Sequence, residues 1–266
     1  MRSMSNKKKK QNFSIIAGPC AIETRDDCIL IAETCKTLCE KYGFKYIFKA
    51  SCTKANRTAS SSFRGVGLEK GLEILAEIKE RFSLPVLTDV HETKEVKATA
   101  KVVDILQIPA FLSRQTELIE AASRTGKIIN IKKAQFMSPN EAKHAYDKAV
   151  NAGASEVFIT ERGTFFGYND LVVDFRNFQI LDSMGIPVIY DVTHSLQQPS
   201  IDETSGGSPE FVMSMASAAV ATGHLSGLFI ETHPEPARAQ SDARSMLPLK
   251  ELERVLQRIR KLLDLS

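Results

Sequence analysis

Short apolar runs and longer amphipathic segments alternate along the chain from residue 13 onwards. Eight of the runs are rich in Val, Ile and Phe and are bounded by turn residues, which predicts buried β-strands. The predicted strands span Phe13–Ala17, Tyr46–Lys49, Val86–Asp89, Ile105–Ile108, Ile128–Lys132, Val157–Thr160, Val188–Asp191 and Leu228–Glu231. Their nearly continuous hydrophobicity is typical of parallel strands covered on both faces.

Helical periodicity fills the segments between and after these runs. The predicted helices span Asp26–Tyr42, Leu68–Arg81, Thr93–Lys101, Gln115–Thr125, Ser138–Ala152, Leu171–Met184, Pro209–Thr222 and Leu249–Leu263. Glycines follow five of the helices, where a left-handed residue commonly ends a helix: Gly43, Gly126, Gly153, Gly185 and Gly223. Alternating strands and helices in this number predict an α/β fold, a TIM (β/α)8 barrel, over residues 13–266.

The size and composition of the chain agree with a single barrel domain. Its 266 residues match the usual length of that fold. Residues 1–12 contain the run Lys7–Lys10, and we expect them to form a flexible basic terminus. Five cysteines without a visible export signal indicate a reducing cytoplasm. A net charge of +3 does not indicate nucleic acid, and no apolar stretch approaches the roughly 20 residues of a membrane span.

Several residues that can bind metals follow or end the predicted strands. The carboxyl ends of parallel barrel strands share one face, so the fold would gather these residues there. Cys20, His194 and Glu231 have such positions, and Asp242 adds a second carboxylate. Zinc and iron(II) accept this set of S, N and O donors more readily than magnesium or calcium. Taken alone, the position of His194 fits a structural histidine equally well.

A second set of residues is basic: Lys49, Lys54, Arg57, Lys132, Lys133 and Arg162. Lys49 and Lys132 end apolar runs, and the burial of such charges requires an anionic partner. Two basic clusters indicate two phosphates or one doubly charged substrate. The sequence carries no Walker, dinucleotide, GxSxG or HExxH motif, which disfavours nucleotide, serine-hydrolase and zincin functions. The residues alone therefore predict a barrel enzyme that acts on phosphorylated small molecules with a divalent metal.

The two longest connections with turn-like composition follow the second and seventh strands, at residues 51–67 and 195–208. Loops of this length on the catalytic face of a barrel commonly carry chemistry or act as lids. We expect both loops to border the substrate site.

Eight motifs then occur in order along the chain. They are Ala17-Gly18-Pro19-Cys20-Ala21-Ile22-Glu23, Phe48-Lys49-Ala50-Ser51 through Lys54-Ala55-Asn56-Arg57-Thr58, Thr88-Asp89-Val90-His91-Glu92, Gln107-Ile108-Pro109-Ala110-Phe111-Leu112, Asn130-Ile131-Lys132-Lys133-Ala134-Gln135-Phe136, Glu161-Arg162-Gly163-Thr164, Asp191-Val192-Thr193-His194-Ser195 and Glu231-Thr232-His233-Pro234. From about residue 13 to about residue 250 the chain closely resembles the 3-deoxy-D-manno-octulosonate 8-phosphate synthases, also called 2-dehydro-3-deoxyphosphooctonate aldolases.

The resemblance implies that phosphoenolpyruvate, cleaved at its C–O bond, condenses with D-arabinose 5-phosphate and water. The products would be the eight-carbon phosphorylated sugar acid, a precursor of lipopolysaccharide, and inorganic phosphate. It also implies a TIM barrel that assembles as a homotetramer.

The motifs imply roles for individual residues. Phosphoenolpyruvate would be held by Lys49, Lys132, Gln135 and Arg162. The pentose phosphate would bind Asn56, Arg57 and Thr58, with Lys54 near both substrates and Asp89 on the sugar hydroxyls. Gln107, Ala110 and Phe111 would complete the substrate site. The residues predicted to be catalytic are Lys54, Asp89, His194 and Asp242.

The resemblance also bears on the metal. Members of this family with Cys in the first motif depend on a metal, whereas members with Asn there do not. The presence of Cys20 therefore predicts a divalent metal held by Cys20, His194, Glu231 and Asp242. Iron(II), zinc and manganese remain open as its identity.

Three other functions compete with this reading. The related 3-deoxy-D-arabino-heptulosonate 7-phosphate synthases take erythrose 4-phosphate, but their phosphate motif typically reads Lys-Pro-Arg-Thr, and Ala55-Asn56 replaces the proline here. A non-catalytic barrel that binds sugar phosphates would not need a metal with an open coordination position. A class II aldolase usually employs several histidines, whereas only His194 has a convincing ligand position.

Overall fold

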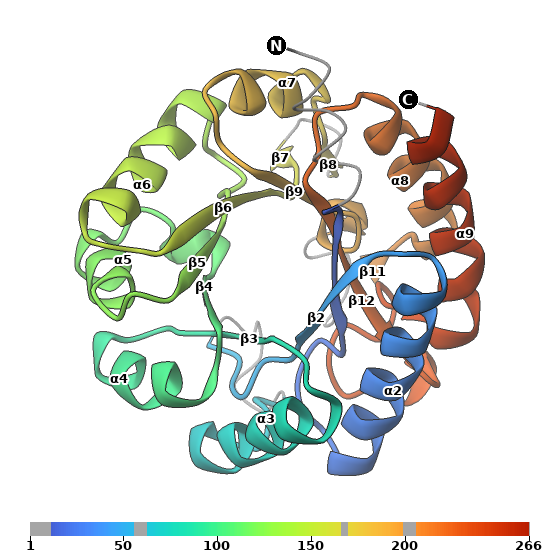
Figure 1. Ribbon diagram of the computed structural model, residues 1–266, viewed down its shortest axis with the longest axis horizontal. Helices are drawn as coiled ribbons and strands as arrows, with labels where there is room; N and C mark the ends of the chain where they lie inside the picture. Colours follow the sequence, from blue (N-terminus) through green and yellow to red (C-terminus); the bar gives the residue numbers. More distant parts are fainter. Residues whose placement is uncertain (1–11, 56–62, 166–169, 199–205, 266) are drawn as a thin grey trace.

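The computed structural model describes residues 12–55, 63–165, 170–198 and 206–265. Within these residues, eight parallel strands pair in sequence order, and the first strand pairs with the last to close a barrel (Figure 1). They are β1 (Ser14–Gly18), β2 (Lys45–Lys49), β3 (Val86–Asp89), β4 (Ile105–Ile108), β5 (Ile128–Lys132), β6 (Glu156–Glu161), β9 (Val188–Asp191) and β12 (Gly227–His233). The predicted TIM barrel is confirmed.

A ring of helices surrounds the strands in Figure 1, and α9 lies beside α2 where the ring closes. The helices are α2 (Arg25–Lys41), α3 (Leu68–Phe82), α4 (Thr93–Val102), α5 (Thr116–Ser123), α6 (Pro139–Asn151), α7 (Arg176–Ser183), α8 (Val212–Ala221) and α9 (Leu249–Leu265). Side-chain caps fix several starts. Thr24 accepts a hydrogen bond from the backbone N of Asp27, and Ser138 forms a capping box with Glu141. All five glycines predicted to end helices have positive φ.

Alternation along the strands sorts the side chains into two cores. Inside the barrel, a plug forms from Ile16, Ile47, Leu87, Ile105, Ile189 and Phe229. Their neighbours along the strands, such as Ile15 and Phe48, belong to the larger core beneath the helices. Successive strand residues point to opposite faces, so a residue two positions after a plug residue also points inward. Those residues are Gly18, Lys49, Asp89, Gln107, Asp191 and Glu231. A polar layer therefore lies directly on the apolar plug, at the carboxyl ends of the strands.

Gly18 is the one member of this layer without a side chain. A Cβ built on it would lie 1.9 Å from the backbone O of Lys49. Strands β1 and β2 can approach this closely only because position 18 is glycine.

Two predicted helices begin later than the periodicity indicates: α8 begins at Val212, after the 3-10 turn η3 (Pro209–Phe211), and α7 begins at Arg176. The pattern predicts a helix from Leu171, but Leu171 and Val172 form β8 (Leu171–Val172), which pairs antiparallel with β7 (Thr164–Phe165). The carboxylate of Asp174 accepts a hydrogen bond from the backbone N of Arg176 at 3.0 Å, and α7 starts there. The predicted start of α7 was wrong because a local hairpin takes up the first two apolar residues.

Shorter elements border the carboxyl face. They are η1 (Ala110–Leu112), η2 (His194–Leu196), β10 (Gln197–Gln198), β11 (Gly206–Gly207), η3 (Pro209–Phe211), η4 (Pro236–Arg238) and β13 (Leu247–Pro248). Residues 56–62 and 199–205, the middle parts of the two long connections, lie outside the described residues, and their lid role stays a prediction. The same holds for the flexible basic terminus expected over residues 1–12, of which only Asn12 is described. Among the helices of the described chain, none is both long and apolar enough to cross a membrane.

Candidate active site

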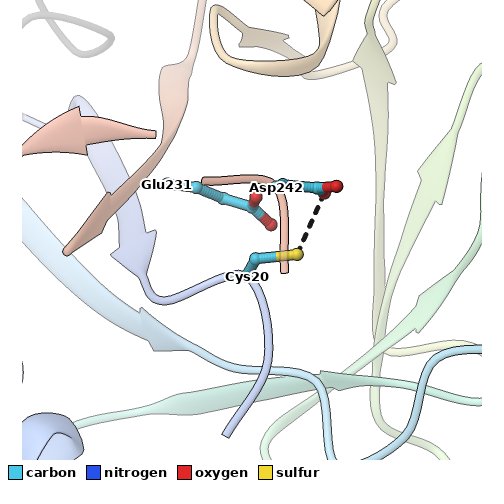
Figure 2. A group of neighbouring side chains, drawn as sticks. All are labelled: Cys20, Glu231 and Asp242. Atoms are coloured by element: carbon cyan, nitrogen blue, oxygen red, sulfur yellow. Dashed lines mark hydrogen bonds between the residues drawn. The ribbon is translucent and has the colours of Figure 1, made fainter. Parts of the chain in front are cut away.

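Three of the four predicted metal ligands lie together at the carboxyl face. Cys20 follows β1, Glu231 belongs to β12, and Asp242 follows η4. Their ligand atoms all lie within 4.8 Å of one another (Figure 2). The Cys20 thiol donates a hydrogen bond to Asp242 Oδ2 at 3.0 Å. Burial raises the pKa of the Cys20 thiol, and the carboxylates of Asp242 and Glu231 raise it further. Cys20 would bind a metal as the thiolate, so metal binding would release the proton of its thiol.

The fourth predicted ligand, His194, lies beside this group. Its Nε2 is 3.6 Å from Glu231 Oε2 and 3.9 Å from Asp242 Oδ2. The other ring nitrogen, Nδ1, lies 2.8 Å from Asp191 Oδ2, and the backbone N of His194 donates to Asp191 Oδ1 at 2.9 Å. A carboxylate that orients a histidine in this way is typical of metal-binding histidines.

The donor set fits a divalent metal. Glu231 Oε2 is buried and has no hydrogen-bond partner in the described chain. Buried polar atoms in folded proteins nearly always have a partner, so this oxygen indicates a missing ligand. A cation among one sulfur, one imidazole nitrogen and two carboxylates would satisfy it.

Lys49 holds Glu231 from the opposite side. Its ammonium group forms an ion pair with Glu231 Oε1 and donates a hydrogen bond to the backbone O of Cys20 at 2.9 Å. Both side chains are fully buried. Burial tends to raise the pKa of Glu231, but Lys49, His194 and Lys54 outweigh it and lower that pKa. Glu231 is therefore ionised at neutral pH.

Lys132 is paired in a similar way. It forms a buried ion pair with Asp191, and its Nζ lies 3.1 Å from the ring centroid of Phe229. Burial lowers the pKa of Lys132 to about 8, despite the opposing effect of Asp191. Burial also tends to raise the pKa of Asp191, but His194 and Lys132 hold it below its ordinary value.

Arg162 differs from the two lysines because no carboxylate within the described residues forms an ion pair with it. Its Nη2 donates to Gln197 Oε1 at 3.2 Å, whereas its buried Nη1 has no hydrogen-bond partner in the part of the chain that the structure describes. Burial lowers the pKa of Arg162, but a guanidinium stays charged in proteins. This buried, unpaired charge calls for an anionic ligand.

Asp89 anchors a chain of hydrogen bonds across the polar layer. Ser51 Oγ donates to Asp89 Oδ2 at 2.6 Å, and the amide of Gln107 donates to Asp89 Oδ1. The chain continues through Asn130, which donates to Gln107 Oε1 at 2.8 Å, and Thr160, which donates to Asn130 Oδ1 at 2.6 Å. Gln107 is thus fixed between two neighbours.

Lys54 reaches Asp89 from the loop after β2, with its Nζ 3.9 Å from Asp89 Oδ2. Burial tends to lower the pKa of Lys54, but the Cys20 sulfur, once it is ionised, and the carboxylates of Asp89, Glu231 and Asp242 raise it. Burial tends to raise the pKa of Asp89, which Lys54 and Lys49 lower instead. Lys54 is therefore a cation and Asp89 an anion near neutral pH.

The remaining predicted site residues differ in placement. Gln135, after β5, is buried and its Oε1 lacks a hydrogen-bond partner in the described chain. Ala110 and Phe111 lie in η1 after β4, and the Phe111 side chain is exposed. Asn56, Arg57 and Thr58 lie outside the described residues.

The sequence of this chain matches one protein family and many proteins of known name. The model of the DAHP synthetase I family matches residues 5–265. The chain belongs to that family. A 2-dehydro-3-deoxyphosphooctonate aldolase of Agrobacterium fabrum is 48% identical over 94% of this chain and 88% of its own length. Proteins of the same name are 46% identical in Rhizobium meliloti, over 94% and 90% of the two chains, and 49% identical in Dechloromonas aromatica, over 92% and 89%. The family resemblance inferred from the motifs is confirmed.

Four residues of the site were given no role in the sequence analysis: Asp191 and Asn130, which begin two of the motifs, and Thr160 and Phe229, which lie outside them. The alternation of the strands contains the signal that identifies them. Asn130 lies two residues before Lys132, Thr160 two before Arg162, and Phe229 two before Glu231, so each points inward with its strand-end neighbour.

The lowered pKa of Lys132 predicts how anion binding depends on pH. Sulfate is a suitable probe because its own charge is constant between pH 6 and pH 10. Below about pH 8, Lys132 is a cation and sulfate affinity should be constant. Above it, the proton is lost and affinity should fall by up to about tenfold per pH unit, which a guanidinium at this position would prevent.

Calorimetric titrations of the wild type and Lys132→Arg over this range test the prediction. If both proteins show the same alkaline decline in sulfate affinity, Lys132 is not the group responsible.

Proposed function

We propose that this protein condenses phosphoenolpyruvate with D-arabinose 5-phosphate and water. The products are 3-deoxy-D-manno-octulosonate 8-phosphate, which feeds lipopolysaccharide biosynthesis, and inorganic phosphate. The observation that carries the proposal is the buried, unpaired guanidinium of Arg162 beside the Lys132–Asp191 pair at the strand ends. The name shared by the relatives supports the choice of reaction.

Arg162, Lys132 and Gln135 hold phosphoenolpyruvate in this proposal. Arg162 Nη1 donates to an anionic oxygen of the substrate, and the N–H groups of the Gln135 side chain act as further donors. Among the described residues, Lys132 donates a hydrogen bond only to Asp191, so the other N–H groups of its ammonium remain for the substrate. Lys49 is engaged by Glu231 and Cys20, and its role toward phosphoenolpyruvate is to hold the neighbouring acid in place.

The pentose end rests on Asp89 and Lys54. Asp89 is an anion and accepts hydrogen bonds from sugar hydroxyls, while Lys54 is a cation between the two substrates. Asn56, Arg57 and Thr58 bind the phosphate of the pentose, as the motif in the loop after β2 implies. C3 of phosphoenolpyruvate bonds to the aldehyde carbon and the water oxygen bonds to C2, while the C=C and aldehyde C=O π bonds open. The C2–O bond to phosphate then breaks, so that C2 becomes a carbonyl; of the two water protons, one ends on the new hydroxyl group and the other leaves with the phosphate.

A divalent metal belongs to this proposal, held by Cys20, His194, Glu231 and Asp242. When bound, it supplies Lewis-acid and orienting chemistry at the sugar aldehyde. Asp191 fixes the ring of His194, and Lys49 fixes Glu231, so the protein orders these donors itself.

The closest rival uses erythrose 4-phosphate in place of arabinose 5-phosphate. The DAHP synthetase I family is named after the heptulosonate-phosphate synthase activity, whereas the similar relatives are named 2-dehydro-3-deoxyphosphooctonate aldolases. The sequence Ala55-Asn56 in place of a proline favours the arabinose phosphate. The two activities would use the same barrel, the same anion site and the same metal. Only the aldose substrate distinguishes them.

Phosphate release from phosphoenolpyruvate tests the proposed reaction. We expect faster release with arabinose 5-phosphate than with erythrose 4-phosphate, and no release without an aldose. Treatment with a chelator should abolish activity, and addition of a divalent ion should restore it. Faster release with erythrose 4-phosphate would assign the rival activity, and chelator-resistant activity would remove the metal from the proposal.

The same assay separates the more distant alternatives. Tight binding of both substrates without phosphate release would indicate a non-catalytic barrel. Enolisation of pyruvate without phosphate release would indicate a class II aldolase.

Replacement of one thiol tests the metal ligands. Cys20→Ala should lose most of its affinity for cobalt(II), together with the near-ultraviolet absorption that a thiolate–cobalt bond produces. Cys28→Ala is the matched control, because Cys28 is buried in α2 and belongs to no ligand group. Full cobalt binding and unchanged absorption in Cys20→Ala would contradict the assignment.

We also propose a cytoplasmic homotetramer. Five buried, free cysteines fit a reducing compartment. Phe111, Phe136 and Phe165, which follow β4 and β5 or lie in β7, are each at least 51% exposed, and a subunit contact would cover such rings. Light scattering should give the mass of four chains, and Phe136→Asp should lower it. A monomer mass for the unmodified protein would contradict the assembly.

A further inference from the structure

The aromatic ring of Phe229 has a position that the proposed function does not by itself explain. Phe229 is the one aromatic residue among the six fully or nearly fully buried side chains that form the plug inside the barrel. It lies two residues before Glu231 on β12 and points to the same interior. Its ring is therefore the boundary between the apolar plug and the charged layer.

Three predicted site residues from three other elements contact or face this ring. Lys132 Nζ, from β5, lies 3.1 Å from the ring centroid, and Lys49 Nζ, from β2, lies 5.4 Å from it. The ring of His194, in η2, has its centroid 5.9 Å away. A cation over an aromatic face is attracted by the negative electrostatic potential of that face, and the attraction is strongest where water is excluded.

The sheet register aligns the ring with the acid that pairs with Lys132. Phe229 lies directly opposite Asp191 in the β9–β12 ladder. The ammonium group of Lys132 is therefore held by two neighbouring strands, through the carboxylate on β9 and the ring on β12. An aliphatic residue at position 229 would leave only carboxylates, chiefly Asp191, to attract the ammonium within the described chain, with no group to hold it at the centre of the barrel.

We propose that Phe229 is a positioning residue for phosphoenolpyruvate, in which the face of the ring forms the floor of the anion site and fixes the Lys132 ammonium toward the substrate. This inference rests on the proposed function, because it takes Lys132 as a ligand of phosphoenolpyruvate. Phe229 contacts the lysine and not the reacting atoms, so its effect is expected on substrate affinity more than on turnover.

Stepwise fluorination of the ring tests the inference without removing its bulk. Fluorine withdraws electron density from the face of the ring and weakens its attraction for a cation, while the shape changes little. Phenylalanine at position 229 is replaced by its mono-, di-, tri- and pentafluoro analogues. The matched series is made at Phe48, which is also fully buried but faces the helices and lies in the outer core.

We expect the KM for phosphoenolpyruvate to rise with each fluorine at position 229 and to reach about tenfold with the pentafluoro ring. The KM for arabinose 5-phosphate and kcat should change much less, and the Phe48 series should leave all three constants unchanged. Thermal melting identifies any analogue that does not fold. If the pentafluoro protein does not fold, the mono- and difluoro proteins still show whether the KM for phosphoenolpyruvate rises with each fluorine.

The result that would overturn the inference is a KM for phosphoenolpyruvate that does not change along the Phe229 series in active protein. An equal rise in the Phe48 series would also overturn it, because the effect would then come from packing. Absence of any phosphoenolpyruvate-dependent activity in the unmodified protein would instead overturn the proposed function, and this inference with it.

Discussion

The burial of charged groups at the carboxyl ends of the strands is the constraint on which the rest of this structure depends. Lys49 pairs with Glu231, and Lys132 pairs with Asp191, with all four side chains nearly inaccessible to water. Loss of one partner from such a pair costs roughly 3–5 kcal/mol, because the remaining charge stays buried. These pairs do not simply stabilise the barrel, since a well-packed apolar pair would do so equally well. They hold fixed charges at the carboxyl ends of the strands, beside Arg162 and the candidate metal ligands.

The period of the strand connects this charged layer to the fold. Each strand places one residue in the apolar plug and, two positions later, one residue in the polar layer. The plug keeps water from the underside of the layer, which strengthens every interaction above it. Gly18 lets β1 approach β2 beside Lys49, so Cys20, just after it, comes close to Glu231. Among the described residues, two atoms of the charged groups in this site have no hydrogen-bond partner: Nη1 of Arg162, whose Nη2 is bonded to Gln197, and Oε2 of Glu231.

Much of this arrangement is predictable from the sequence, for reasons that the structure makes plain. The strands β3, β4, β5 and β9 have the predicted bounds, because parallel strands buried on both faces read as continuous apolar runs. The approach of Cys20 to Glu231 follows from the closed barrel once the strand ends are known, whereas Asp242 joins them from the segment after η4, which the strand ends do not predict. The start of α7 could not be predicted, since the hairpin of β7 and β8 depends on pairing that helical periodicity does not encode.

Other features of the site depend on contacts between strands. That Asp191 serves both Lys132 and His194, and that Phe229 lies under Lys132, could be read only from the three-dimensional register. The position of His194 was ambiguous in sequence because a histidine after a strand can serve structure or chemistry. Its contact with Asp191 and its distance from the two carboxylates favour a ligand. In the proposed function the pentose phosphate binds Asn56, Arg57 and Thr58, which lie outside the described residues.

The central claim is that the unpaired Arg162 and the buried Lys132 form one anion site at the strand ends. A crystal structure of the protein with phosphoenolpyruvate tests it most directly. We expect an anionic oxygen of the substrate to accept a hydrogen bond from Arg162 Nη1 and the same molecule to contact Lys132. A phosphoenolpyruvate molecule bound elsewhere, with Arg162 Nη1 still buried and without a partner, would contradict it.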